Sequence, residues 1–121
     1  MNTQTFTQAI KKTVYDAAAK GVVEVLHKPA GRRPDPELVR LSQWFNSLNA
    51  QDQQAVARVA NLAADQATYN FLLVLDGLVT VEPVGEKGKL ELFYDNGKER
   101  TQLNDENTDQ LSSLFKNRLQ P

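Results

Sequence analysis

The chain has 121 residues, of which 40% are hydrophobic, so it is long enough to bury a core as one domain over residues 1–121. Its 14 Lys and Arg residues nearly balance its 15 Asp and Glu residues. The formal charge of −1 argues against a nucleic-acid binder that works through bulk charge and against a strongly acidic DNA mimic. Because cysteine is absent, disulfides, thiolate nucleophiles and zinc–thiolate sites are excluded.

The expected location follows from the apolar segments. The opening segment MNTQTFTQAIKK lacks the apolar core of a signal peptide. The longest apolar run, residues 71–75, is far shorter than the roughly 20 residues that a membrane-spanning helix needs. We therefore expect a cytosolic protein without a membrane partner.

A first helix is predicted by apolar residues that recur every three or four positions. The face they form consists of Phe6, Ile10, Val14, Ala17, Ala18, Val22, Val25 and Leu26. Gly21 lies inside this pattern and indicates a kink or a close packing contact. Pro29 ends the helix, because the residue before a proline disfavours helical geometry. Residues 29–34 are then expected to form a loop.

A second helix, over residues 36–48, has the clearest start signal in the chain. Asp35 suits the N-cap, Pro36 suits the first helical position, and Glu37 favours the positive helix end. The predicted buried stripe is Leu38, Leu41, Phe45 and Leu48, with Trp44 on its flank.

A third helix is predicted over residues 50–76, and its end can be interpreted in two ways. Asp76-Gly77, which cuts the apolar segment FLLVLDGLVTVEP, suits either the tight turn of a hairpin or a helix end capped by Gly77. Asn49 is the expected N-cap, with Asp52 at the capping-box position. Because no Gly or Pro interrupts residues 50–76 and the spacing stays helical, we favour the helix. Residues 71–75 are apolar on every side, so we expect this end to be central and fully covered.

After Gly77 the apolar period changes to two, which predicts strands over residues 78–83, 89–95 and 99–103. Asn96-Gly97 suits a two-residue turn. That turn would place Asp95 opposite Lys98 and Phe93 opposite Arg100.

A last helix is expected to open at residues 104–106. Its apolar face would be Leu111, Leu114, Phe115 and Leu119. The predicted fold class is therefore α+β: three N-terminal helices with the third long and central, a small antiparallel meander of three strands, and a C-terminal helix.

Three segments, GRRPDPELVRLSQWFNSLN, FLLVLDG and LELFYDNGKERTQLND, carry a resemblance. Together they resemble a family of small uncharacterised bacterial proteins that contain a domain of unknown function. The resemblance covers most of the chain from Gly31 onward. It implies a bacterial, cytosolic origin and no particular activity.

The sequence offers little catalytic chemistry. His27 is the only histidine, and without a flanking His, Cys or close carboxylate pair it is best interpreted as a surface residue near a helix end. No G-x-S-x-G elbow and no phosphate-loop pattern is present. We therefore predict no catalytic residue, no metal and no cofactor.

Lys28, Arg32 and Arg33 cluster in the first loop and could bind a phosphate or a partner's carboxylate. The alternative, which we favour, is a solvated loop or ion pairs with Asp35 and Glu37.

Asp76 breaks a local rule, because a carboxylate at the negative end of a helix is unfavourable. Such exceptions are expected at functional or strained sites. Asp76 is therefore a candidate for ligand binding together with the Arg32/Arg33 loop. The favoured alternative is structural: Asp76 accepts hydrogen bonds from backbone amides in the turn or pairs with an arginine such as Arg32 or Arg100.

Phe93 and Arg100 are the candidate partner-binding residues. The expected alternation places Leu90, Leu92, Tyr94 and Leu103 on the face that meets the helices and Phe93 on the opposite face. There Phe93 either packs against Arg100 in a cation–π pair, lies beneath the last helix, or anchors a protein partner beside Arg100.

Three functions remain open at this point. The favoured hypothesis is a non-enzymatic protein-interaction module, such as an inhibitor, an immunity-type protein or an adaptor. The second is a small-ligand-binding or enzymatic domain that uses Asp76 and the Arg32/Arg33 loop. The third is a structural homodimer that pairs through the first helix.

Overall fold

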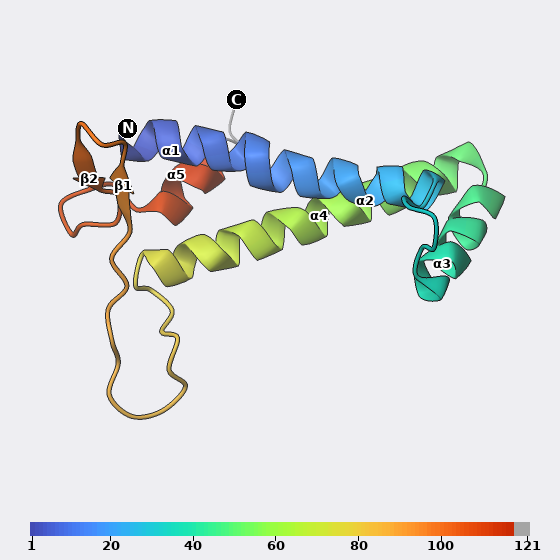
Figure 1. Ribbon diagram of the computed structural model, residues 1–121. Helices are drawn as coiled ribbons and strands as arrows, with labels where there is room; N and C mark the ends of the chain where they lie inside the picture. The colour runs from blue at the N-terminus through green and yellow to red at the C-terminus, as the bar shows by residue number, and fades with distance from the viewer. Residues whose placement is uncertain (118–121) are drawn as a thin grey trace. The chain divides into compact units, whose positions relative to one another are not determined.

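The computed structural model describes residues 1–117 and confirms the α+β class (Figure 1). The chain divides into two compact units. Unit 1 comprises Met1–Lys12 and Gln66–Pro121, and unit 2 comprises Thr13–Asp65. The prediction of a single domain over residues 1–121 stays a prediction.

The predicted first helix is observed as three consecutive helical segments. They are α1 (Thr3–Ile10), a π-helical segment (Lys11–Asp16) and α2 (Ala17–His27). The interpretation of Gly21 was wrong, because α2 is regular there and a Cβ at Gly21 would have no neighbour within 4 Å. The irregular geometry lies instead at Lys11–Asp16, where no glycine or proline marks it.

The start of α3 (Pro36–Ser47) confirms the predicted cap. The Asp35 carboxylate accepts a hydrogen bond from the Glu37 amide at 2.8 Å. The predicted buried stripe is only partly correct, because Phe45 is buried whereas Leu41 is exposed. The buried face of α3 runs through Ser42 and Phe45, one position further along the chain than Leu41.

Unit 2 is held together where α2 packs against α3. Phe45 is 1% exposed, and the His27 ring meets it edge-on at 4.9 Å between centroids. The Asn46 side chain donates to the His27 carbonyl at 3.0 Å, and Gln53 donates to the Phe45 carbonyl at 3.0 Å. His27 therefore contributes to packing at the end of α2.

The long helix α4 (Ala50–Leu75) begins and ends as the sequence predicts. Asn49 caps it by accepting from the Asp52 amide at 2.8 Å. At the other end Gly77 has a φ of 76°, its amide donates to Val74, and the Leu78 amide donates back to Leu73 at 3.0 Å. This pair of bonds is a Schellman motif, so the hairpin alternative at Asp76-Gly77 is wrong.

The prediction that this end of α4 is fully covered is wrong. Leu72 is buried, but Phe71, the residue before it, is 62% exposed. A helix end that is apolar all round needs neighbours on every side, and the described chain leaves the Phe71 side uncovered.

Two strands are found in the described residues instead of three. Strands β1 (Phe93–Asp95) and β2 (Arg100–Gln102) form an antiparallel hairpin, and residues 78–83 form no strand. The predicted register was also wrong, because Asp95 lies opposite Arg100 and not opposite Lys98.

The observed register differs from the predicted one because the hairpin loop contains four residues, 96–99, and not two. The Asn96 side chain accepts from the amides of Lys98 and Glu99, and the Asn96 amide donates to the Glu99 carbonyl. The shift is by two positions, and side chains alternate with a period of two, so each side chain keeps its predicted face.

The last described helix, α5 (Leu111–Asn117), begins later than predicted, and Leu119 lies outside the described residues. Residues 104–106 do not open it. Asn104 binds the loop that precedes β1, and Asp105 forms a turn with Asn107 and Thr108. Helix α5 packs against α1, and the core of unit 1 consists of Leu72, Leu103, Leu111 and Phe115.

Candidate functional site

The most unusual feature of unit 1 is the connection between α4 and β1, residues 76–92, which contains no helix or strand (Figure 1). Connections in compact domains are usually about four to six residues long, and much longer ones are commonly functional. We call residues 78–92 the apolar loop, because of the side chains described below.

Asn104 fixes the far end of the apolar loop to the end of α4. Its side-chain amide donates to the carbonyls of Leu75 at 2.7 Å and Leu90 at 2.8 Å. Its side-chain oxygen accepts from the Leu92 amide at 2.9 Å. The Asn104 side chain therefore connects its own segment to the end of α4 and to the end of the apolar loop.

The tip of the apolar loop is closed by Glu82. Its carboxylate accepts from the Gly88 amide at 3.3 Å, and its carbonyl accepts from the Lys87 ammonium group. Together with the Schellman motif at Gly77, these contacts hold the loop at its start, its tip and its end.

The apolar loop presents its hydrophobic side chains to solvent. Val84, near the tip, is 82% exposed. The other exposed members are Leu78, Val79, Val81 and Leu90. A loop of this composition would normally bury such side chains, so their exposure marks a candidate interaction surface.

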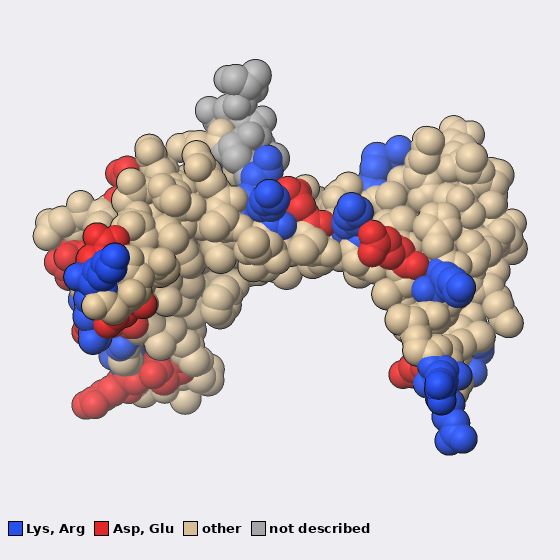
Figure 2. Space-filling view, turned by 45° about the horizontal axis from the view of Figure 1, so that its top comes forward, with Lys and Arg blue, Asp and Glu red and all other residues tan. Residues whose placement is uncertain are grey.

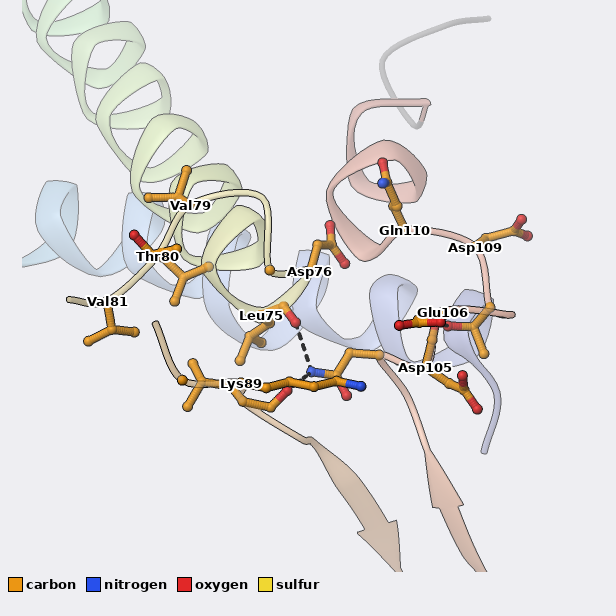
Figure 3. Close-up of a pocket in the computed structure, with 16 residues that line it drawn as sticks. Leu75, Asp76, Val79, Thr80, Val81, Lys89, Asp105, Glu106, Asp109 and Gln110 are labelled. Atoms are coloured by element: carbon orange, nitrogen blue, oxygen red, sulfur yellow. Dashed lines mark hydrogen bonds between the residues drawn. The ribbon is translucent and has the colours of Figure 1, made fainter. Parts of the chain in front are cut away.

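A pocket of about 440 Å³ lies at the base of the apolar loop (Figure 3). Its apolar walls come from the end of α4 and from both arms of the loop, and include Leu75, Val79, Val81 and Leu90. The segment before α5 contributes three carboxylates, Asp105, Glu106 and Asp109, while Lys89 is the cation that borders the pocket. In Figure 3, Val79 and Val81 lie across the pocket from Glu106 and Asp105.

Asp76 lies at the edge of the same pocket, where its carboxylate is already engaged (Figure 3). One oxygen accepts from the Leu111 amide and the other from the Ser112 amide, each at 2.8 Å. The unfavourable position of Asp76 at the end of α4 is thus offset by its favourable position at the start of α5. The structural alternative is correct in kind, although the amides belong to α5 and not to the turn.

Phe93 and Arg100 form the predicted cation–π pair. The Arg100 guanidinium carbon lies 4.3 Å from the centre of the Phe93 ring. Phe93 remains 39% exposed, on the hairpin face opposite to the buried Leu103. The role of this pair in binding a partner stays a prediction.

Lys28, Arg32 and Arg33 lie in unit 2 and are exposed to solvent. Within residues 1–117, the alternative of ion pairs with Asp35 and Glu37 is not observed. Asp35 caps α3, and Glu37 pairs with Arg40 at 2.8 Å. The three side chains are therefore exposed, and their binding of a phosphate or a partner's carboxylate stays a prediction. Its proposed cooperation with Asp76, which belongs to unit 1, stays a prediction.

In the described part of the chain, no three His, Cys, Asp or Glu side chains are grouped so that they could hold a metal ion. On the face shown in Figure 2, basic and acidic residues are interspersed. No helix within residues 1–117 has the length and apolar content to cross a membrane.

Sequence patterns did not identify Asn104 or the exposed apolar loop. Asn104 binds carbonyls 29 and 14 positions away, so no local pattern could mark it as more than a helix opener. The spacing predicts strands at residues 78–83 and 89–95, because a period of two is the same whether or not a neighbouring strand pairs with it.

Comparisons with known proteins add no assignment: no protein-family model, curated protein or solved structure matches this chain.

Proposed function

We propose that this chain is a non-enzymatic protein-interaction module, and that it binds its partner through the apolar loop. One observation carries the proposal: the loop exposes a row of hydrophobic side chains while hydrogen bonds fix its start, tip and end. The bacterial, cytosolic origin implied by the family resemblance is retained as part of this proposal.

The physical reason is that a fixed loop loses little conformational entropy when a partner binds. Burial of an exposed Val or Leu side chain contributes about 1.5–3 kcal/mol. A loop that hydrogen bonds hold at these points and that already displays several such side chains is therefore suited to association. Phe93 and Arg100 supply a second candidate contact, since aromatic residues and arginine are enriched at binding hot spots.

A crosslinking experiment tests this proposal. A photoreactive benzoyl-phenylalanine is placed at Val84, and the protein is irradiated in cells of its source organism. The matched control is the same substitution at Val59, a valine of α4 in unit 2 that is 65% exposed. We expect a discrete adduct from position 84 and not from position 59. Equal labelling from both positions, or none from position 84, would contradict the proposal.

The homodimer is a second candidate, because the first helix also leaves apolar side chains uncovered. Val14 and Val22, both in unit 2, are exposed. Sedimentation equilibrium of the wild type and of Val22→Asp tests the homodimer. A dimer that pairs through this helix should dissociate in the variant. A wild type that is monomeric would exclude the homodimer.

The small-ligand or enzymatic alternative has less support. Both carboxylate oxygens of Asp76 already accept backbone hydrogen bonds, so a ligand would have to compete with the cap of α5.

A further inference from the structure

We infer that the pocket at the base of the apolar loop binds an extended segment of a partner protein in which basic and apolar side chains alternate. This inference rests on the proposed function and names the chemistry of the partner. Three features of the pocket carry it: its apolar walls, its charge and the positions of these two on opposite sides of the pocket.

The walls favour apolar side chains. The pocket volume of about 440 Å³ falls within the roughly 300–1,000 Å³ that is usual for ligand sites. Val79 and Val81 on one arm of the loop and Leu90 on the other are exposed, although they line a concave surface. A partner side chain placed between them would remove apolar surface from water on both sides.

The charge favours a basic partner. Asp105, Glu106 and Asp109 border the pocket, against one cation, Lys89. In Figure 3, Glu106 is directed toward the pocket, whereas Asp109 lies at its rim and is directed outward. Within residues 1–117, neither Glu106 nor Asp109 forms an ion pair. The excess of carboxylates complements lysine or arginine and repels an acidic segment.

The positions of the two walls favour an extended partner. In Figure 3, Val79 and Val81 lie on one side of the pocket and Glu106 lies on the other. An extended segment directs successive side chains to opposite sides, so a segment placed between these walls can contact both.

Alternation joins these features into one ligand, because apolar residues of the partner can then contact the valines while its basic residues face the carboxylates. Other occupants of the pocket are a second copy of this chain, through its residues 78–83, or the same segment of one chain that pairs with its own residues 89–92.

The experiment uses three fluorescent seven-residue peptides and the full chain. The first alternates lysine with valine, the second has glutamate in place of lysine, and the third has serine in place of valine. Binding is measured by fluorescence anisotropy, and the bound surface is mapped by amide chemical shifts. We expect binding of the lysine–valine peptide only, with the largest shifts in residues 79–90 and 104–110.

Two variants and a matched control test the charge. Glu106→Gln and Asp109→Asn should each raise the dissociation constant about two- to fivefold, the range for partly exposed ion pairs. Glu24→Gln on α2, which changes the net charge equally in unit 2, should leave it unchanged. Equal binding of the glutamate peptide, or no response to Glu106→Gln, would overturn the inference.

The remaining outcomes separate the two proposals. If the crosslink at position 84 forms but none of the peptides binds, the interaction module stands and the basic–apolar partner is rejected. If no peptide binds and the chain self-associates until Val81 is changed to Asp, the occupant is a second copy. If shifts show residues 78–83 paired with 89–92 in one free chain, the chain itself occupies the pocket. Either of these last two results rejects the inference.

Discussion

At the scale of single residues, Asp76 and Gly77 join two helices that are far apart in the sequence. Gly77 ends α4 with a φ of 76°, a conformation that residues with a Cβ rarely adopt. Asp76, beside it, caps the first two amides of α5, which lie 35 and 36 positions further along the chain. A single turn therefore ends one helix and begins the next.

Gly77→Ala should destabilise the protein by about 1 kcal/mol, because alanine is strained at this φ. No atom lies within 4 Å of the Cβ that would be added, so the effect is conformational and not a clash. Urea unfolding measures it. Gly21→Ala is the matched control, because its Cβ is equally unobstructed but lies inside α2, where alanine should stabilise by up to about 1 kcal/mol. Similar destabilisation by both substitutions would contradict the role of the positive φ.

Asp76→Ala should lower the free energy of unfolding by about 1–2 kcal/mol, the range for loss of an N-cap. The Leu111 and Ser112 amides would lose their acceptor, so their hydrogen exchange should accelerate more than that of the α2 amides. Glu24→Ala, which removes an exposed carboxylate of α2, should change stability by less than about 0.5 kcal/mol. Unchanged exchange at Ser112 in the Asp76 variant would show that the cap is not needed.

At the scale of elements, the hairpin shows why one contact can be right while the register is wrong. The shift by two positions moves Arg100 from opposite Phe93 to opposite Asp95, yet keeps it on the same face. The guanidinium group then reaches the Phe93 ring diagonally at 4.3 Å. Diagonal neighbours of this kind lie within reach of long side chains.

A double-mutant cycle of Phe93→Ala and Arg100→Ala should give a coupling energy of about 0.5–1 kcal/mol, as expected for a cation–π pair at an exposed site. Chemical denaturation of the wild type, both single variants and the double variant provides the four values. A coupling near zero would mean that the pair makes no contribution to hairpin stability. If both single variants stay folded and lose a partner captured by the wild type, Phe93 is also an anchor.

At the scale of the whole molecule, the described chain leaves apolar side chains uncovered in both units. Phe71 and the apolar loop belong to unit 1, whereas Trp44, which is 51% exposed, belongs to unit 2. Contiguous apolar patches commonly mark interaction sites, whereas apolar residues exposed singly are normal on protein surfaces. The chemistry available to catalysis is small by comparison: one histidine and no cysteine.

We expect the purified protein to show no hydrolase, transferase or redox turnover, because the sequence contains one histidine, no cysteine and no recognisable catalytic motif. Screens with generic ester, phosphate and redox substrates test this expectation. Turnover that disappears in a folded Asp76→Asn variant, or in Arg32→Ala or Arg33→Ala, would instead support the ligand-binding or enzymatic alternative.

Local chemistry explains the parts of the fold that the sequence by itself determined. The caps at Asp35 and Asn49 depend on an amide two or three positions away, and the end of α4 at Gly77 depends on carbonyls three and five positions back. Such contacts form whatever the rest of the chain does, so the residue types alone predict them. The faces of the hairpin were likewise predictable, because they depend only on alternation.

Only the tertiary structure decided the features that require distant partners. Helix α5 begins where the Asp76 carboxylate meets its amides, and the apolar loop is fixed where Asn104 meets the backbone of Leu75 and Leu90. An apolar pattern indicates which side chains would stabilise the fold if they were buried. It does not indicate whether another element lies close enough to cover them. Phe71 and residues 78–83 show the difference, because their patterns predict burial and strand pairing, while the described chain supplies neither a covering element nor a pairing strand.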